Sequence, residues 1–347
     1  MELNGSNENN FWKNHSLDDF QSIVTRKSSY DSEITSICFL KDGRIASSTQ
    51  GHFILIFNKY TFKIEISIEE KKLICYMNIN KDGILIVCLA GTFLNLYEIR
   101  GKSYKIFQTI KPYSLLINFI GKFDNSFSIK KFVELKNGNL ALLVWGYALS
   151  FYEKNKNNNK YSYLNKYSEN VLDVCQLENN QYCIALEFRN LLQFLDMNLK
   201  KVTETIECND FSFSESKNKL LLMNKKDLIL VGKKKIVIVD IQNKTKIKDI
   251  KFDINLDVSA YITSIYKLAD NILMVGCCNG YIKQLKYDDS KKEFRKISYK
   301  GDKQFDSSFL KIVNSISVFD NNIIAALKST SIGSSLVIYK LIKNKSK

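Results

Sequence analysis

The sequence predicts an all-β chain folded as a seven-bladed β-propeller with four-stranded antiparallel blades. Three observations lead to this fold class. A two-residue turn signal recurs seven times along the 347 residues, runs of alternating apolar residues flank each signal, and helical periodicity is nearly absent. A period of about 40–45 residues with four short strands per unit is typical of propeller blades.

The turn signals are mostly pairs that tolerate the left-handed backbone of tight hairpins. They lie between 40 and 55 residues apart, which is close to the length of one blade. In chain order they are Asp42-Gly43, Asp82-Gly83, Asn137-Gly138, Asn179-Asn180, Lys226-Asp227, Asp270-Asn271 and Asn321-Asn322.

Each predicted blade opens with an apolar strand just before its turn signal. These first strands are residues 34–40, 73–79, 129–135, 171–177, 219–224, 262–268 and 313–319. For the fifth blade, residues 211–216 are an alternative first strand. A second strand follows the signal, a third ends in an apolar residue such as Phe57, and a fourth carries more charge. Alternating charged and apolar residues in the fourth strand fit a strand with one face in water.

The last blade lacks a fourth strand, because the six residues IKNKSK that follow its third strand at 335–341 are too few and too polar to form one. Residues 20–27, FQSIVTRK, are strand-like and otherwise unassigned. Since propellers remove sheet edges by circular closure, we expect this N-terminal strand to complete the last blade and close the ring. Residues 1–19 are then a flexible tail and residues 20–347 a single domain. The Asn/Lys tract at 154–160 is expected to be a disordered loop tip.

The repeats resemble WD repeats, and the segment ITSICFLKDGRIASSTQGHFILIFN (34–58) carries the resemblance most fully. It follows the family pattern of apolar strand, Asp-Gly turn, small-residue strand, Gly turn and a strand with an aromatic end. Phe57, Tyr97 and Val239 stand where the family has the Trp of its Trp-Asp pair. Gly51-His52 lies in a different turn from the family's Gly-His dipeptide. The resemblance implies the propeller fold.

The charge balance is strongly basic, with 51 Lys and Arg against 36 Asp and Glu and a formal net charge of +15. Only five of the basic residues are Arg, the side chain best suited to phosphate and base contacts. The nearest matches to a phosphoinositide-binding motif, around Arg189 and Arg295, contain one Arg each. We therefore favour a solvated lysine surface and expect no specific nucleic-acid recognition. Weak contact with anionic surfaces stays open.

Enzyme motifs are missing from the sequence, and two histidines leave little scope for a histidine base. None of the eight cysteines forms a C-x-x-C pair, so no zinc site is expected. We predict a protein without catalytic residues, cofactor or metal. Aliphatic neighbours indicate buried, reduced cysteines in an intracellular protein. The polar start at 1–10 and the lack of a long apolar run predict neither secretion nor a membrane span. The expected location is the cytoplasm, with the nucleus as an alternative.

What remains is recognition, because the loops of a propeller present side chains to partners. The turns between second and third strands hold aromatic or cationic residues, types enriched in binding hot spots. The predicted partner-binding residues are Gln50, His52, Trp145, Tyr147, Arg189, Lys233, Lys234, Lys235 and Tyr281. The sequence thus predicts a non-catalytic scaffold or adaptor for proteins or peptides, as a monomer or as a subunit of a larger complex. The alternative is a propeller that binds polyanions, either phosphoinositide headgroups or nucleic acid.

Overall fold

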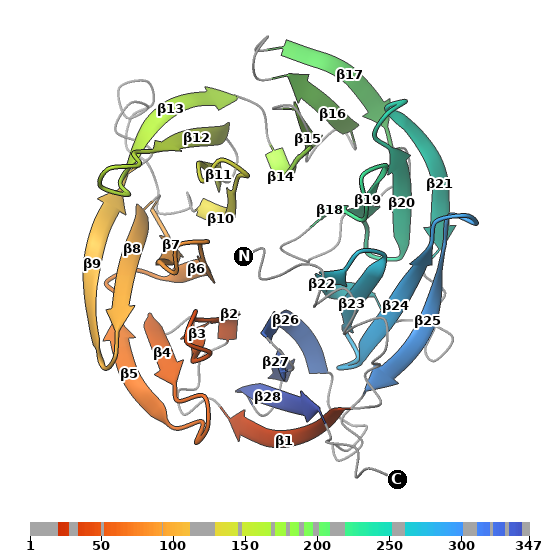
Figure 1. Ribbon diagram of the computed structural model, residues 1–347. Helices are drawn as coiled ribbons and strands as arrows, with labels where there is room; N and C mark the ends of the chain where they lie inside the picture. Colours follow the sequence, from red (N-terminus) through yellow and green to blue (C-terminus); the bar gives the residue numbers. More distant parts are fainter. Residues whose placement is uncertain are drawn as a thin grey trace. The chain divides into compact units, whose positions relative to one another are not determined.

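Short antiparallel strands make up the chain in the computed structural model (Figure 1). The structure describes residues 20–27, 34–49, 52–91, 93–111, 129–144, 148–167, 171–177, 181–186, 191–196, 201–208, 219–251, 261–300, 311–319, 322–329 and 333–341. Every regular element in these ranges is a strand, and each sheet contains four strands. Within the same ranges, no helix is long and apolar enough to cross a membrane.

The first of two compact units spans Cys38–Cys208, so residues 34–37 of β2 belong to the second unit. The strands from β2 to β17 form four sheets and pair in chain order. They are β2 (Ile34–Phe39), β3 (Ile45–Thr49), β4 (Phe53–Phe57) and β5 (Ile64–Glu69); β6 (Ile74–Ile79), β7 (Leu85–Leu89), β8 (Phe93–Arg100) and β9 (Ser103–Ile110); β10 (Ile129–Glu134), β11 (Leu140–Val144), β12 (Ala148–Lys154) and β13 (Tyr161–Tyr167); and β14 (Val171–Gln176), β15 (Gln181–Leu186), β16 (Leu191–Asp196) and β17 (Lys201–Glu207).

The second unit combines Glu2–Ile37 with Asn209–Lys347. Its three sheets include one that recruits the N-terminal strand, in the order β1-β28-β27-β26. The strands are β18 (Leu220–Leu222), β19 (Asp227–Val231), β20 (Lys235–Asp240) and β21 (Thr245–Lys251); β22 (Ile262–Ala269), β23 (Ile272–Cys277), β24 (Ile282–Asp288) and β25 (Glu293–Lys300); and β26 (Lys311–Phe319), β27 (Asn322–Ser329), β28 (Gly333–Leu341) and β1 (Phe20–Lys27).

This grouping corrects the expected fold class, which placed all blades in one continuous seven-bladed ring. The described chain instead divides into two compact units, each with three complete sheets, and the division along the chain falls within β2 of the β2–β5 sheet. The expectation went wrong because evenly spaced turn signals reveal how strands pair within a sheet, but not which sheets pack into one unit. The expected N-terminal tail at 1–19 lies outside the described residues. The one-domain organisation of 20–347 stays a prediction.

The strands lie close to where the alternating patterns predict them. In the fifth sheet, β18 at Leu220–Leu222 shows that the interpretation of residues 219–224 as the first strand was the right one. The hairpins between first and second strands use left-handed residues, with φ of 83° at Gly43 and 63° at Asn271. Such angles favour Gly and Asn, which explains the recurring pairs.

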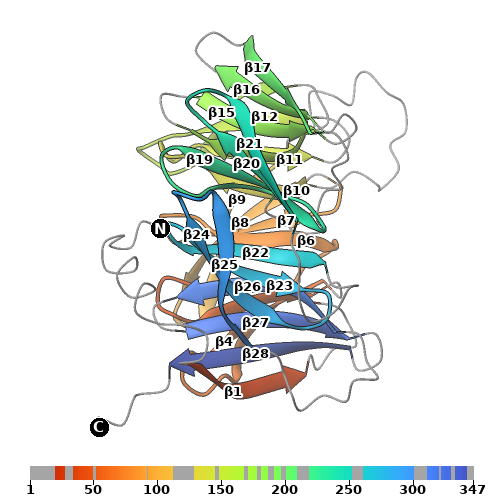
Figure 2. The same ribbon diagram turned by 90° about the vertical axis from the view of Figure 1, so that its right-hand side faces the viewer.

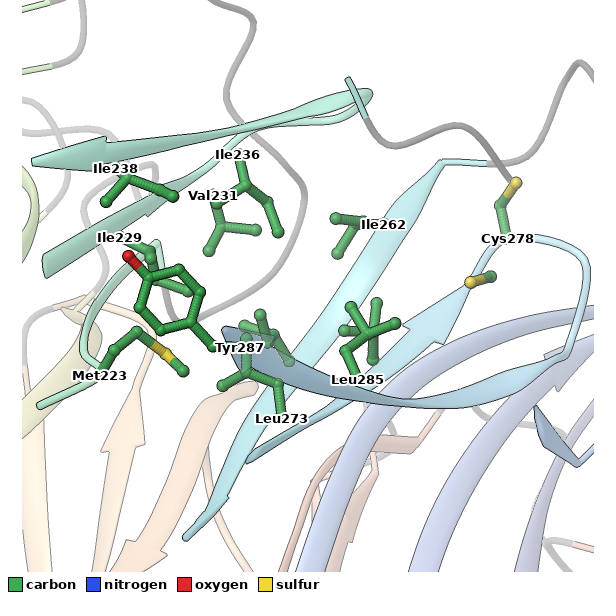
Figure 3. Packing of buried hydrophobic residues seen from close by; sticks show 13 residues of the cluster. Met223, Ile229, Val231, Ile236, Ile238, Ile262, Leu273, Cys278, Leu285 and Tyr287 are labelled. Atoms are coloured by element: carbon green, nitrogen blue, oxygen red, sulfur yellow. The ribbon is translucent and has the colours of Figure 1, made fainter. Parts of the chain in front are cut away.

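The apolar core lies between neighbouring sheets of each unit. In the second unit, one cluster joins Ile229, Ile236 and Ile238 of the β18–β21 sheet to Leu285 and Tyr287 of β24. Figure 3 shows Tyr287 beside Met223 and Ile229, while Leu285 lies on the side of Ile262 and Leu273. In the sheets from β2 to β25, apolar residues lie on both faces, and the described residues of the second and third strands are mostly buried.

First strands share a second feature, a register shift near their N-terminal end. The shift lies between Ile129 and Lys131 in β10, and between Val171 and Asp173 in β14. Such bulges add one residue and re-aim the side chains that follow. The bulge in β10 lies just before Lys131, and the bulge in β14 lies just before Asp173. These two residues form an ion pair between the two sheets, with Lys131 Nζ 2.6 Å from Asp173 Oδ1. Both side chains are buried, so this pair links the first strands of adjacent sheets away from solvent.

The N-terminal strand completes the last sheet, as the sequence predicts. β1 pairs antiparallel with β28, with Phe20 opposite Leu341 and Lys27 opposite Ser335. Figure 2 shows β1 at the edge of this sheet, next to β28. The pairing supplies a partner for the outer edge of β28, which would otherwise be unpaired in that sheet.

The expectation of a disordered loop tip at 154–160 is wrong. Lys154 ends β12, and the next residues form a closed turn in which Asn155 N–H donates to the Lys160 carbonyl at 2.8 Å. Asn159 has a φ of 58°, and Asn157 N–H donates to Asn155 Oδ1 at 2.9 Å. Asparagine side chains stabilise turns through such local bonds, so this Asn-rich composition indicated a hairpin.

Candidate functional site

The predicted partner-binding residues fall partly inside the described ranges. Those inside are His52, Lys233, Lys234, Lys235 and Tyr281. Those outside the described residues are Gln50, Trp145, Tyr147 and Arg189. All five described residues lie in or beside a turn between the second and third strands of a sheet, as the repeat spacing predicts.

His52 belongs to the first unit, between β3 and β4. Its φ of 70° is in the left-handed region, and its carbonyl accepts a hydrogen bond from Glu70 N–H at 2.8 Å. Its Nδ1 atom is buried and has no hydrogen-bond partner among the described residues. The other four described residues belong to the second unit.

Tyr261 connects the two predicted turns of the second unit. Its N–H donates to Cys278 Sγ at 3.1 Å, and its carbonyl accepts from Cys278 N–H at 3.0 Å. The next residue, Ile262, donates its N–H to the Lys233 carbonyl at 3.0 Å. The turn after β19 and the turn after β23 therefore flank the same backbone segment. The sequence offered no sign of this, because Tyr261 lies outside every turn signal.

Cationic and aromatic groups gather on this segment and its two turns. We call residues Lys233, Lys234, Lys235, Tyr261 and Tyr281 the basic turn surface. Lys233 Nζ lies 5.6 Å from the centre of the Tyr261 ring, within range of a cation–π interaction. Lys235 Nζ lies 3.4 Å from Asp249 Oδ2, whereas Lys234 is exposed and has no ion pair within the described ranges. The surface therefore carries an excess of positive charge beside aromatic rings.

Lys283 lies directly behind this surface and was missed by the sequence reasoning. It is the second residue of β24, just after the turn that contains Tyr281. Lys283 is only 4% exposed, and its side chain has neither a hydrogen bond nor an ion pair with the described residues. Burial lowers the pKa of its ammonium group. The segment IKQLKYD did contain a signal, since Lys283 is in phase with the apolar residues Leu285 and Tyr287.

A related arrangement occurs in the first unit, around Phe93 at the start of β8. Lys72 Nζ lies 3.7 Å and Lys111 Nζ 5.5 Å from the centre of the Phe93 ring. Gly91 makes room for one of them, because a Cβ at this position would lie 2.8 Å from Lys72 Nζ. Leu73, the residue after Lys72 in the chain, is 49% exposed. Lysine on an aromatic ring is thus a feature of both units.

The described residues offer little for catalysis. They contain no group of three or more His, Cys, Asp or Glu that could hold a metal ion. The carboxylates at the turn signals have local roles: Asp42 Oδ1 accepts a hydrogen bond from Arg44 N–H at 3.0 Å, and Asp270 Oδ1 pairs with Lys267 Nζ at 2.9 Å. These contacts fit turn formers, as the sequence indicated. What the geometry provides is a surface on which cationic and aromatic side chains lie together.

The solved structures provide the comparison that decides the fold. One, described as the structure of U3-55K, has a TM-score of 0.67 and 11% identity, and the match covers 94% of this chain and 99% of that chain. Another, the crystal structure of RRP9 WD40 repeats, has a TM-score of 0.67 and 12% identity, with 93% and 100% covered. The chain has the fold of a WD-like β-propeller. No protein-family model and no curated protein matches the sequence.

Within this fold, two tyrosines near the ends of third strands donate hydrogen bonds to buried carboxylates. Tyr287 Oη donates to Asp227 Oδ2 at 3.0 Å, and Lys292 Nζ lies 2.6 Å from the same oxygen. At the equivalent position of the β6–β9 sheet, Tyr97 Oη donates to Glu70 Oε1 at 2.5 Å. Burial is the main reason that the pKa values of both tyrosines are raised. The phenols act as donors that hold buried carboxylates in place.

Proposed function

We propose that this chain is a non-catalytic scaffold that binds partner proteins through the basic turn surface. The observation that carries the proposal is the convergence of two turns on Tyr261, which places Lys233 against an aromatic ring and leaves Lys234 exposed. Aromatic residues supply large contact areas with little loss of conformational freedom, and they are enriched in binding hot spots. The WD-like fold supports the same role, since its loops stand on rigid sheets.

The charge of the surface indicates the kind of protein partner. Lysines beside aromatic rings favour a segment that combines acidic and apolar side chains, because each lysine can pair with a carboxylate while the rings cover apolar groups. We therefore propose an acidic segment of another protein as the partner. A cytoplasmic location and an assembly as monomer or complex subunit remain expectations from the sequence.

Affinity capture from the native cell, with quantitative identification of bound proteins, tests this function. The double variant Lys234→Glu and Tyr281→Ala reverses one exposed charge and removes one ring of the surface. We expect it to lose most of the partner protein that the unchanged chain captures, because hot-spot losses at one surface are large. The melting temperature should stay nearly the same, since neither side chain belongs to the buried core.

The matched control is the double variant Lys201→Glu and Tyr60→Ala. It makes the same two chemical changes in the first unit, at an exposed lysine of β17 and at Tyr60, which is 73% exposed. This control should capture the partner as the unchanged chain does. The proposed function would be contradicted if both double variants lost the same share of captured partner. It would also be contradicted if the variant at Lys234 and Tyr281 captured as much partner as the unchanged chain.

A further inference from the structure

Lys283 faces the boundary between the two sheets that carry the basic turn surface. Along β24, Ile282 belongs to the core cluster shared with the β26–β28 sheet. Leu285 and Tyr287 belong to the cluster shared with the β18–β21 sheet. Because β24 pairs with β23 in unbroken register, Lys283 points to the same side as Leu285 and Tyr287. Its side chain therefore lies between β24 and the sheet that holds Lys233–Lys235.

Among the residues that the structure describes, none forms an ion pair that compensates the charge of Lys283. The charged or titratable groups that act on the pKa of Lys283 are the thiol of Cys277 and the ammonium of Lys296. Burial raises the pKa of Cys277 to about 11, so this thiol is neutral at physiological pH. Lys296 adds a second positive charge. A buried ammonium without a counter-ion is costly, and proteins pair such groups or bind a ligand to them.

We propose that Lys283 is the receptor for a carboxylate of the acidic partner segment, a glutamate or aspartate side chain that enters beside the turn containing Tyr281. This inference rests on the proposed function and names the group that the surface selects. Charge complementarity carries it: Lys283 has no ion pair among the described residues, and the exposed Lys296 adds positive charge that acts on the same ammonium group.

The position of Lys283 favours a protein side chain over a nucleic acid. A glutamate carries its carboxylate on a slender, flexible stem that can reach a residue with 4% exposure. The phosphates of a duplex lie along a rigid cylinder and are contacted by exposed cations. In the free chain, the buried ammonium of Lys283 has lost its hydration and gains no attraction to a described counter-ion. A bound carboxylate would supply this Coulomb attraction.

The proposal predicts opposite effects of one substitution on stability and on binding. Lys283→Met keeps the length of the apolar stem and removes the buried charge, so the free protein should unfold at a higher urea concentration. The same variant should bind a hexaglutamate peptide about tenfold more weakly or worse in calorimetry at low salt, because the anchoring charge is gone. Lys283→Gln, a polar variant, should show the same loss of binding.

Lys286→Met is the matched control, since it removes a lysine three residues along β24, on the opposite face. This variant should bind hexaglutamate with the affinity of the unchanged chain, and uncharged hexaglutamine should bind to none of the proteins. The proposal would be overturned if Lys283→Met bound hexaglutamate as tightly as the unchanged chain. It would also be overturned if the substitution weakened binding of a DNA duplex more than binding of the peptide. A lower stability of Lys283→Met would overturn it as well, because it would reveal a counter-ion within the chain.

The two failures can be told apart. If the double variant at Lys234 and Tyr281 loses its cellular partner while Lys283→Met keeps it, the scaffold function stands and the role of Lys283 is wrong. If hexaglutamate binding depends on Lys283 but the double variant still captures the partner, the carboxylate site stands and the proposed partner surface is wrong.

Discussion

At the scale of single residues, tyrosines at equivalent positions of two sheets bond to buried carboxylates from different parts of the chain. Tyr97 and Tyr287 occupy equivalent places near the end of third strands, yet one phenol reaches Glu70 and the other Asp227. The sequence predicted an aromatic residue at both places but not its partners. Those partners come from a neighbouring sheet or from the connection leading into the sheet, and repeat spacing carries no information about such contacts. Lys283 was missed as well, although its phase with Leu285 and Tyr287 along β24 indicated a buried position.

The bond between Tyr287 and Asp227 should contribute measurably to stability. Tyr287→Phe removes the phenol that donates to the buried Asp227 carboxylate at 3.0 Å. We expect the free energy of unfolding to fall by about 1–3 kcal/mol, the usual cost of losing a buried hydrogen bond to a charged group. Tyr152→Phe is the control, since Tyr152 is buried at the equivalent position but its phenol has no hydrogen bond in the described part of the chain. Urea titration of both variants should show the larger loss for Tyr287→Phe.

At the scale of elements, pairing within sheets was predictable because two local signals specify it. Alternating apolar residues define the strands, and Asn, Asp and Gly define the hairpins between them. The sequence also predicted the long-range pairing of β1 with β28, since an incomplete last sheet needs a strand and residues 20–27 were unassigned. The bulges in β10 and β14 were not predictable. They depend on packing between first strands, where Lys131 meets Asp173.

Removal of β1 should therefore destabilise the protein. Deleting residues 1–30 exposes the hydrogen-bonding edge of β28 from Ser335 to Leu341. We expect the free energy of unfolding to fall by several kcal/mol, well beyond the effect of ordinary surface changes. Deleting only residues 1–15 keeps all of β1 and should leave the melting curve nearly unchanged. If the two truncated proteins melt alike, β1 contributes nothing to the last sheet in solution.

At the scale of the whole molecule, the net charge of +15 is spread over lysines whose neighbours differ widely. Some, such as Lys131, are buried in ion pairs, while Lys72 and Lys233 lie against aromatic rings. Net charge alone reveals none of these differences, so the sequence could not separate a partner surface from a solvated one. It also could not reveal the division into two units, which depends on contacts between sheets.

Salt dependence separates general attraction to polyanions from recognition at the basic turn surface. Binding to duplex DNA should be weak, independent of base sequence and lost by about 200 mM salt, because it releases counter-ions without specific contacts. Fluorescence anisotropy with two unrelated duplexes measures this. Tight DNA binding that survives this salt concentration and disappears when Lys233, Lys234 and Lys235 are all changed to Glu would favour the polyanion alternative.

The register of β1 against β28 also determines how the protein responds to mechanical force. Phe20, the first residue of β1, lies opposite Leu341, the last residue of β28, so the chain enters and leaves this pair at the same end. A pull on the two chain ends therefore loads the Phe20–Leu341 end first, and the cross-strand hydrogen bonds break one after another. Strands loaded from opposite ends would resist in shear, with all their bonds sharing the load. The strand that protects the last sheet against thermal unfolding is thus the first to peel away under tension.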